Sequence, residues 1–112
     1  MEFTFSSNKL AKLCSSHDQM VRQFGLQMAR RLEMRLQQLE ATASLADLRQ
    51  LSQVRAHELI GDRDEQISLD LVHPFRLILQ VANDPVPRLV EGGLDWGLVT
   101  SVVVLEVTDT HG

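Results

Sequence analysis

The spacing of the apolar residues changes once along this chain, and that change limits the possible folds more than any other feature. Before residue 50 the apolar residues recur every three or four positions, which is the period of one face of an α-helix. The longest such series is Val21, Phe24, Met28, Leu32, Leu36 and Leu39. From residue 54 onward apolar and polar residues alternate, as in strands with one buried face. The sequence therefore predicts an α+β fold.

The predicted elements follow from these periods and from capping residues. Phe3 and Phe5 alternate with polar residues in a first strand. Helices are expected after Ser7, over 17–42 and after Ser44, because serine is a good N-cap. Four further strands are expected over 54–60, 66–71, 75–81 and 99–107. Short turns join the first three of these, so they form an antiparallel meander that packs against the long helix, while 83–97 is a long Pro- and Gly-containing loop.

Length and composition limit the class of protein. A chain of 112 residues is expected to form a single domain over 1–112. Its one cysteine, Cys14, has no second cysteine to pair with, and neither a signal peptide nor an apolar run of about 18 residues is visible. We therefore expect a soluble cytoplasmic protein that does not enter a membrane.

The charge is unevenly distributed, although the net charge is −4. Residues 8–57 carry eight basic and four acidic side chains, whereas residues 58–112 carry three basic and ten acidic ones. A local basic face attracts phosphate groups within roughly 8 Å at physiological salt, whatever the net charge. Nucleic acid therefore remains a possible partner, but the net sign does not favour strong nonspecific binding to RNA.

Polar residues suited to phosphodiester chemistry occur at three places in the second half. They are Arg55 with His57, Arg63 with Arg76, and Asp109 with His111. A histidine side chain exchanges its proton at about pH 6.5 and can act as base or acid near neutrality. Arginine stays charged and presents a planar fork to phosphate oxygens. An antiparallel sheet could bring these groups to one surface, which would suit cleavage of a phosphodiester without a metal ion.

Several motifs, in order and at matching spacing, resemble the HigB-type plasmid maintenance killer proteins of the RelE superfamily. The matching strings are HELIGDR at 57–63, ISLDL at 67–71, HPFRLI at 73–78, NDPVP at 83–87, GGLDW at 92–96 and EVTDTH at 106–111. The resemblance covers nearly the whole chain and is strongest from His57 onward. It implies a RelE-like fold, with an N-terminal strand and helices packed on a small, mainly antiparallel sheet.

The resemblance also implies a function. Such proteins are toxins of type II toxin-antitoxin systems, ribosome-dependent endoribonucleases that cut messenger RNA without metal or cofactor. By position, His57 matches an acid-base histidine and Arg76 the arginine that neutralises the phosphorane. Asp109 and His111 match the C-terminal motif, and Arg63 matches a phosphate contact. The implied partners are mRNA on the ribosome and a cognate antitoxin, a small helix-turn-helix protein.

Four positions differ from the family pattern and keep a second hypothesis open. Ile60 and Asp64 stand where relatives usually carry lysine, Glu65 stands where they carry glycine, and Thr110 replaces a tyrosine. The alternative is a catalytically weakened or inactive RelE-fold protein that binds an antitoxin or another partner. A DNA-binding regulator using the basic helix is a third possibility, disfavoured because no helix-turn-helix pattern is visible.

Other polar or reactive residues have simpler interpretations. Arg30, Arg31 and Arg35 are expected on the solvent side of the long helix. Cys14 shares the apolar face of the first helix, which favours burial over nucleophilic catalysis. Trp96 is expected to anchor its loop against the fold.

Overall fold

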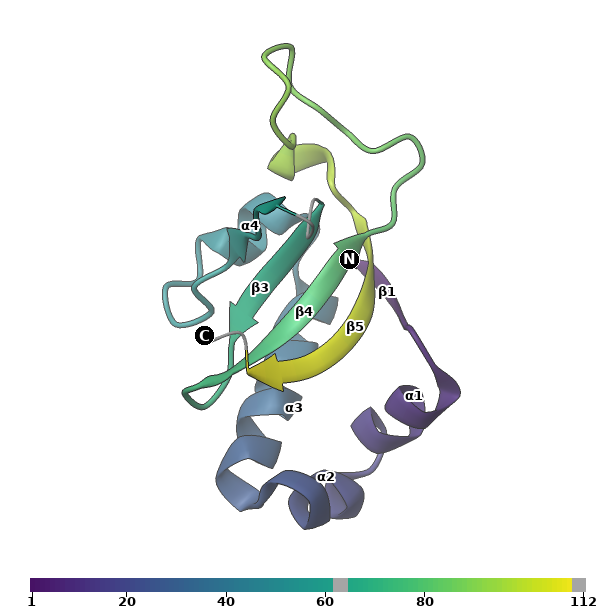
Figure 1. Cartoon of the computed structure of the whole chain (residues 1–112), viewed down its shortest axis with the longest axis vertical. Helices are drawn as coiled ribbons and strands as arrows, with labels where there is room; N and C mark the ends of the chain where they lie inside the picture. Colours follow the sequence, from purple (N-terminus) through teal and green to yellow (C-terminus); the bar gives the residue numbers. More distant parts are fainter. Residues whose placement is uncertain (62–64, 110–112) are drawn as a thin grey trace.

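Five strands form one sheet, and the helices pack on one of its faces. The structure is a computed structural model that describes residues 1–61 and 65–109. The strands are β1 (Glu2–Phe5), β2 (His57–Glu58), β3 (Gln66–Asp70), β4 (Phe75–Val81) and β5 (Ser101–Asp109), and the helices are α1 (Asn8–Cys14), α2 (His17–Phe24), α3 (Leu26–Ala41) and α4 (Leu45–Arg49). Figure 1 shows the sheet in front of α3 and α4. The predicted α+β class is confirmed.

Serine side chains begin three of the helices, as the sequence predicts. The side chains of Ser7, Ser16 and Ser44 each accept a hydrogen bond from a backbone N–H in the first turn of the helix that follows. Each bond satisfies one of the N–H groups that a helix leaves unpaired at its start. Local capping chemistry therefore sets three of the four helix starts.

The prediction of one continuous helix over 17–42 is wrong. Gly25 divides it into α2 and α3, with φ of 84° and ψ of 164°, and it both ends the first helix and begins the second. This backbone conformation is open to glycine and strained for other residues. The apolar stripe continues across the break. Val21 and Phe24 before it pack against the same core that contains Met28, Leu32 and Leu39 after it.

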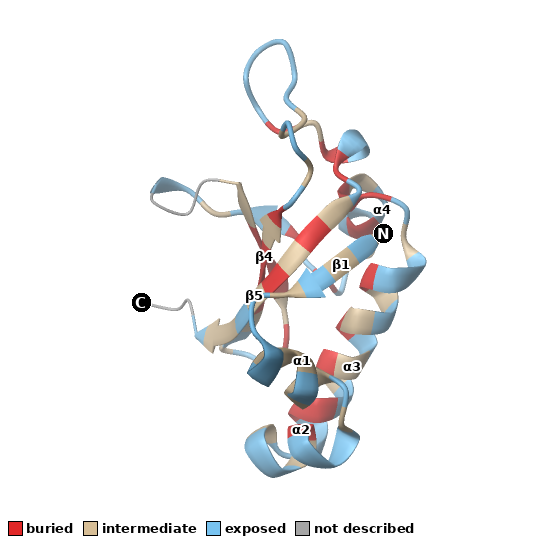
Figure 2. Cartoon of the chain, turned by 90° about the vertical axis from the view of Figure 1, so that its right-hand side faces the viewer, coloured by how far each residue is buried: buried red, intermediate tan, exposed pale blue. Residues whose placement is uncertain are grey.

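The sheet has the order β1-β5-β4-β3-β2. Strands β2 to β5 form the predicted antiparallel meander, and β1 pairs in parallel with β5. Leu77, Leu79 and Val81 of β4 belong to the core that α3 covers. Arg76, Ile78 and Gln80 alternate with them and therefore lie on the other face. Figure 2 shows that this second face has no helix over it, and we call it the open face.

The strand predicted over 54–60 is much shorter, since only His57 and Glu58 pair with β3. Arg55 has φ of 49°, in the left-handed region, which interrupts an extended chain. This conformation costs a residue with a side chain roughly 1–2 kcal/mol. Ile60 lies beyond the strand and is 89% exposed. The apolar alternation here therefore overestimates the length of the strand.

The loop between β4 and β5 is anchored at its base. Asn83 accepts hydrogen bonds from the backbone N–H groups of Thr100 and Ser101. Trp96 begins the short 3-10 helix η2 (Trp96–Leu98), is buried, and donates from Nε1 to Glu58 Oε1 at 2.9 Å. The guanidinium of Arg49 lies 4.3 Å from the centre of the indole. The prediction that Trp96 anchors the loop is confirmed.

Among the described residues, no helix is both long and apolar enough to span a bilayer.

Cys14 is expected to react slowly with thiol reagents. Burial raises the pKa of its thiol from 9.0 to about 11, so at pH 8 the thiolate fraction is about 100-fold below that of an ordinary cysteine. Alkylation by iodoacetamide, followed by mass spectrometry, should be slower by about that factor in the folded chain than in urea. Equal rates in both states would contradict this prediction.

The same thiol makes stability depend on pH in the alkaline range. The folded chain holds this proton more tightly than the unfolded chain, because the folded pKa is raised. The contribution to stability is therefore complete below pH 9.0 and is lost as the pH rises towards about 11.

Candidate active site

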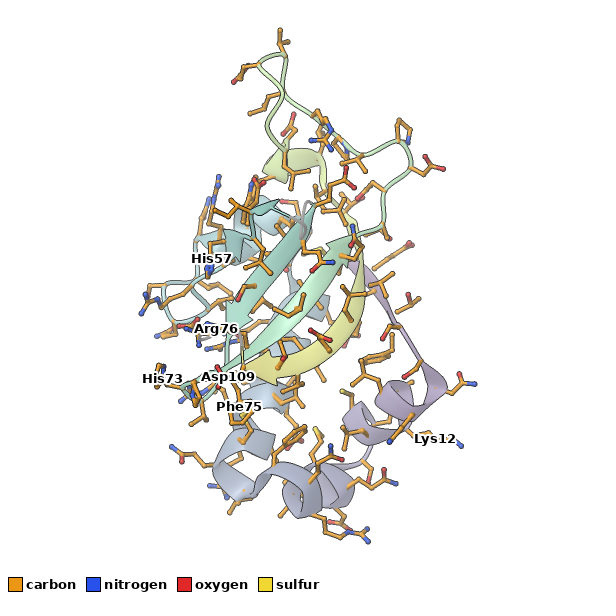
Figure 3. All side chains as sticks on the ribbon, in the orientation of Figure 1. Lys12, His57, His73, Phe75, Arg76 and Asp109 are labelled. Atoms are coloured by element: carbon orange, nitrogen blue, oxygen red, sulfur yellow. The ribbon has the colours of Figure 1, made fainter. Side chains whose placement is uncertain are left out.

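Two of the predicted catalytic residues lie on the open face. His57 of β2 pairs with Ser68 of β3, while Arg76 of β4 pairs with Asp70 of β3. Ser68 and Asp70 are two residues apart and therefore point to the same side of the sheet. From strand spacing and rise, the Cα atoms of His57 and Arg76 are about 12 Å apart. Both side chains can thus reach one ligand that lies across β3. Figure 3 shows both residues on this side of the sheet.

Asp70 joins two of the three arginines of the predicted site, Arg55 and Arg76. Its Oδ1 lies 3.1 Å from Arg76 Nε, and its Oδ2 lies 3.4 Å from Arg55 Nε. The side chain of Arg76 is 20% exposed and that of Arg55 is 77% exposed. Two positive charges thus share one negative charge, which leaves the group with a net positive charge. This group of three side chains can therefore attract a phosphate.

The orientation of His57 suits a general base. Its Nδ1 lies 3.1 Å from the backbone oxygen of Arg55, and the side chain is exposed. A carbonyl oxygen only accepts hydrogen bonds, so Nδ1 carries the hydrogen in this contact. The neutral ring then presents Nε2 as a proton acceptor. The left-handed turn at Arg55 contributes to both functional contacts, because it directs this carbonyl to His57 and the side chain to Asp70.

Arg35 is buried, and its predicted place on the solvent side of the helix is wrong. It is 1% exposed and donates to the backbone oxygens of Asp70 at 2.6 Å and Gln53 at 2.8 Å. It also donates to Gln38 Oε1 at 3.0 Å. Burial lowers the pKa of Arg35, and the nearby charge of Arg31 lowers it further, while Asp70 raises it. A cation thus lies within the fold directly behind Asp70.

A spacing signal could have revealed the burial of Arg35. It is three residues after Leu32 and four before Leu39, both fully buried, so it shares their helix face. Asp70 gives no comparable signal, because its partners come from three separate parts of the sequence.

Ser68 lies on the open face and is also buried. Among the described residues, its Oγ has no hydrogen-bond partner.

One further predicted site residue, Asp109, lies within the described part of the chain. Asp109 is the last residue of β5 and pairs with Phe75, so alternation starts its side chain on the opposite face from Arg76. Figure 3 shows it at the end of the sheet near Phe75. Arg63 and His111 lie outside the described residues, as do Asp64 and Thr110. The roles of these residues stay predictions.

The chemistry open to the described groups is that of a base beside two guanidiniums. His57 can accept a proton through Nε2, and the arginines can bind oxygens on which negative charge develops. Within 1–61 and 65–109, no group of three or more His, Cys, Asp or Glu residues could hold a metal ion. His57 and the two arginines offer acid-base and electrostatic catalysis.

Comparison with known proteins adds no relative. No protein-family model matches the sequence, and no curated protein matches it. The resemblance to HigB-type proteins therefore depends on the quoted motifs, and it stays a prediction.

Proposed function

We propose that this chain is a HigB-type toxin of the RelE superfamily, a metal-free endoribonuclease that cuts messenger RNA on the ribosome. The observation that supports the proposal most is the open face of the sheet. There an exposed imidazole with a free acceptor nitrogen lies beside two arginines that share Asp70. The proposal also implies a cytoplasmic location, where ribosomes are found, and a small helix-turn-helix antitoxin as partner.

The reaction assigns one step to each group. His57 Nε2 takes the proton from a ribose 2′-hydroxyl, and that oxygen forms a bond to the adjacent phosphorus. The guanidinium of Arg76 stabilises the negative charge on the nonbridging oxygens as the bond to the 5′-oxygen breaks. An acid gives the leaving oxygen a proton, and His111 is the predicted donor. The products are a 2′,3′-cyclic phosphate and a 5′-hydroxyl, so DNA, which lacks the 2′-hydroxyl, is not a substrate.

A second candidate function is favoured by the exposure of Ile60. This residue is 89% exposed at a position where the resembled family usually carries a lysine. An exposed isoleucine binds no phosphate, but it can contribute to an apolar contact with a protein. A noncatalytic RelE-fold protein that binds an antitoxin or another partner would retain the scaffold and lack cleavage.

Inducible expression in a bacterial host separates the two candidates. We expect induction to arrest growth and to leave translated messages cut within codons, with 2′,3′-cyclic phosphate ends detected by end-specific RNA sequencing. Co-expression of a small helix-turn-helix protein encoded beside the chain should restore growth. Normal growth and intact messages, in cells that contain the folded protein, would favour the noncatalytic candidate.

A further inference from the structure

The two arginines of the open face contact Asp70 through the same part of the guanidinium. In each case the atom nearest the carboxylate is Nε, at 3.1 Å for Arg76 and 3.4 Å for Arg55. A guanidinium carries five N–H donors, of which Nε supplies one. Arg76 places a second donor, on Nη1, against the backbone oxygen of Phe75 at 3.2 Å. The contact with Asp70 therefore holds each guanidinium at its Nε. The terminal nitrogens, Nη1 and Nη2, lie farther from the carboxylate.

The main chain of Asp70 is held from behind the sheet. The backbone oxygen of Asp70 accepts from the buried Arg35 of α3, and its N–H donates to the backbone oxygen of Val54 at 2.8 Å. Arg31 reaches the backbone oxygen of the next residue, Leu71, at 3.5 Å. A buried guanidinium and a backbone hydrogen bond to Val54 thus fix the position from which the carboxylate projects.

We propose that Asp70 is a positioning residue of the ribonuclease site, which orients Arg76, and more weakly Arg55, so that their terminal amino groups face the scissile phosphate. This inference rests on the proposed function. The order of strength follows from exposure, because the contact with Arg55 is largely solvated and such ion pairs contribute little. The Arg76 contact is closer and less exposed. If the Asp70 carboxylate instead competed with the phosphate for these arginines, its removal would make RNA cleavage faster.

Asp70→Asn is the variant that tests this role. An amide has one acceptor oxygen and no charge, so it holds at most one of the two guanidiniums, and more weakly. We expect cleavage of translated mRNA by purified protein and ribosomes to fall about 10- to 100-fold, because the variant loses the charge that pairs with the Arg76 guanidinium. Asp70→Glu keeps both oxygens and the charge, and should recover part of the activity.

A direct measurement of side-chain order separates positioning from general folding. In the wild-type chain, the Nε–H signal of Arg76 in nitrogen-15 NMR spectra should exchange slowly with water, because Nε lies 3.1 Å from Asp70 Oδ1 and the side chain is only 20% exposed. In Asp70→Asn it should exchange faster, while the backbone amide spectrum and the melting temperature stay close to the wild type. The signal is assigned to Arg76 because it is absent from the spectrum of the Arg76→Lys chain, which has no guanidinium at this position. Asp84→Asn, the same change on an exposed loop residue, is the matched control.

The outcomes are distinct. A folded Asp70→Asn chain that cuts mRNA as fast as, or faster than, the wild type overturns the inference and leaves the proposed function intact. Unchanged exchange of the Arg76 signal also overturns it. A wild-type chain that cuts no message overturns the proposed function, and the positioning role with it.

Discussion

Replacing His57 with alanine is expected to lower the rate of mRNA cleavage by about 10²- to 10⁴-fold, the usual contribution of a general base. The side chain is exposed, and its ring forms a hydrogen bond with the backbone oxygen of Arg55. Its loss should therefore leave the fold intact, and surface substitutions of this kind change stability by about 0.5 kcal/mol or less. Cleavage of a translated message in a purified system measures the rate, and thermal unfolding confirms the fold.

Arg76→Ala should give a loss of similar size, about 10²- to 10³-fold, because it removes a donor to the charge that develops on the phosphate. His17→Ala and Arg88→Ala are matched controls, since these residues make surface ion pairs with Glu33 and Glu65 and have no role in the proposed chemistry. Both controls should cut mRNA at nearly the wild-type rate. Full activity in a folded His57→Ala or Arg76→Ala chain would contradict the assigned roles.

Arg35→Ala is expected to lower the free energy of unfolding by about 2–5 kcal/mol, the usual cost of truncating a large buried side chain to alanine. The guanidinium is 1% exposed and donates to two backbone oxygens and one side-chain oxygen. After truncation these oxygens lose this donor, and an acceptor left without a partner adds about 1–3 kcal/mol where it is buried. The loss is large beside a typical total stability of about 5–15 kcal/mol.

Urea unfolding followed by circular dichroism measures this effect. Arg30→Ala is the matched control, because Arg30 lies in the same helix and is exposed. It should change the unfolding free energy by about 0.5 kcal/mol or less. Arg35→Met fills the space but supplies no donors, so it should also destabilise the chain. A midpoint in Arg35→Met equal to that of the wild type would show that the hydrogen bonds contribute nothing.

The features of the fold that depend on local chemistry could be predicted from the sequence. Serine caps set three helix starts, and the alternation of Phe75 to Val81 matched β4 at both ends. The placement of His57 and Arg76 on one face follows from the same alternation once the strands pair. Features that depend on the backbone conformation of a single residue could not be predicted, because the spacing of apolar residues carries no information about φ and ψ. Gly25 and Arg55 are the two cases, one breaking a helix and the other shortening a strand.

The least predictable part of the candidate site is the environment of Asp70. Its contacts come from α3, from the segment before β2 and from β4, so no short window of sequence contains them. Arg35 was misplaced for a related reason, since a charged residue on an apolar stripe is usually expected to turn towards water. Two of the oxygens that accept hydrogen bonds from Arg35 belong to the backbone, and every residue type supplies a backbone oxygen. Only the folded chain identifies which oxygens are near.

The hydrogen bond between Trp96 and Glu58 gives this protein an intrinsic optical probe. Trp96 is the only tryptophan of the chain, and Glu58 is the immediate neighbour of His57. Indole emission responds to the polarity and hydrogen bonding of its surroundings. Any ligand or partner that shifts β2 should therefore alter the emission spectrum of the unlabelled protein, so events beside the imidazole can be followed in real time without a dye.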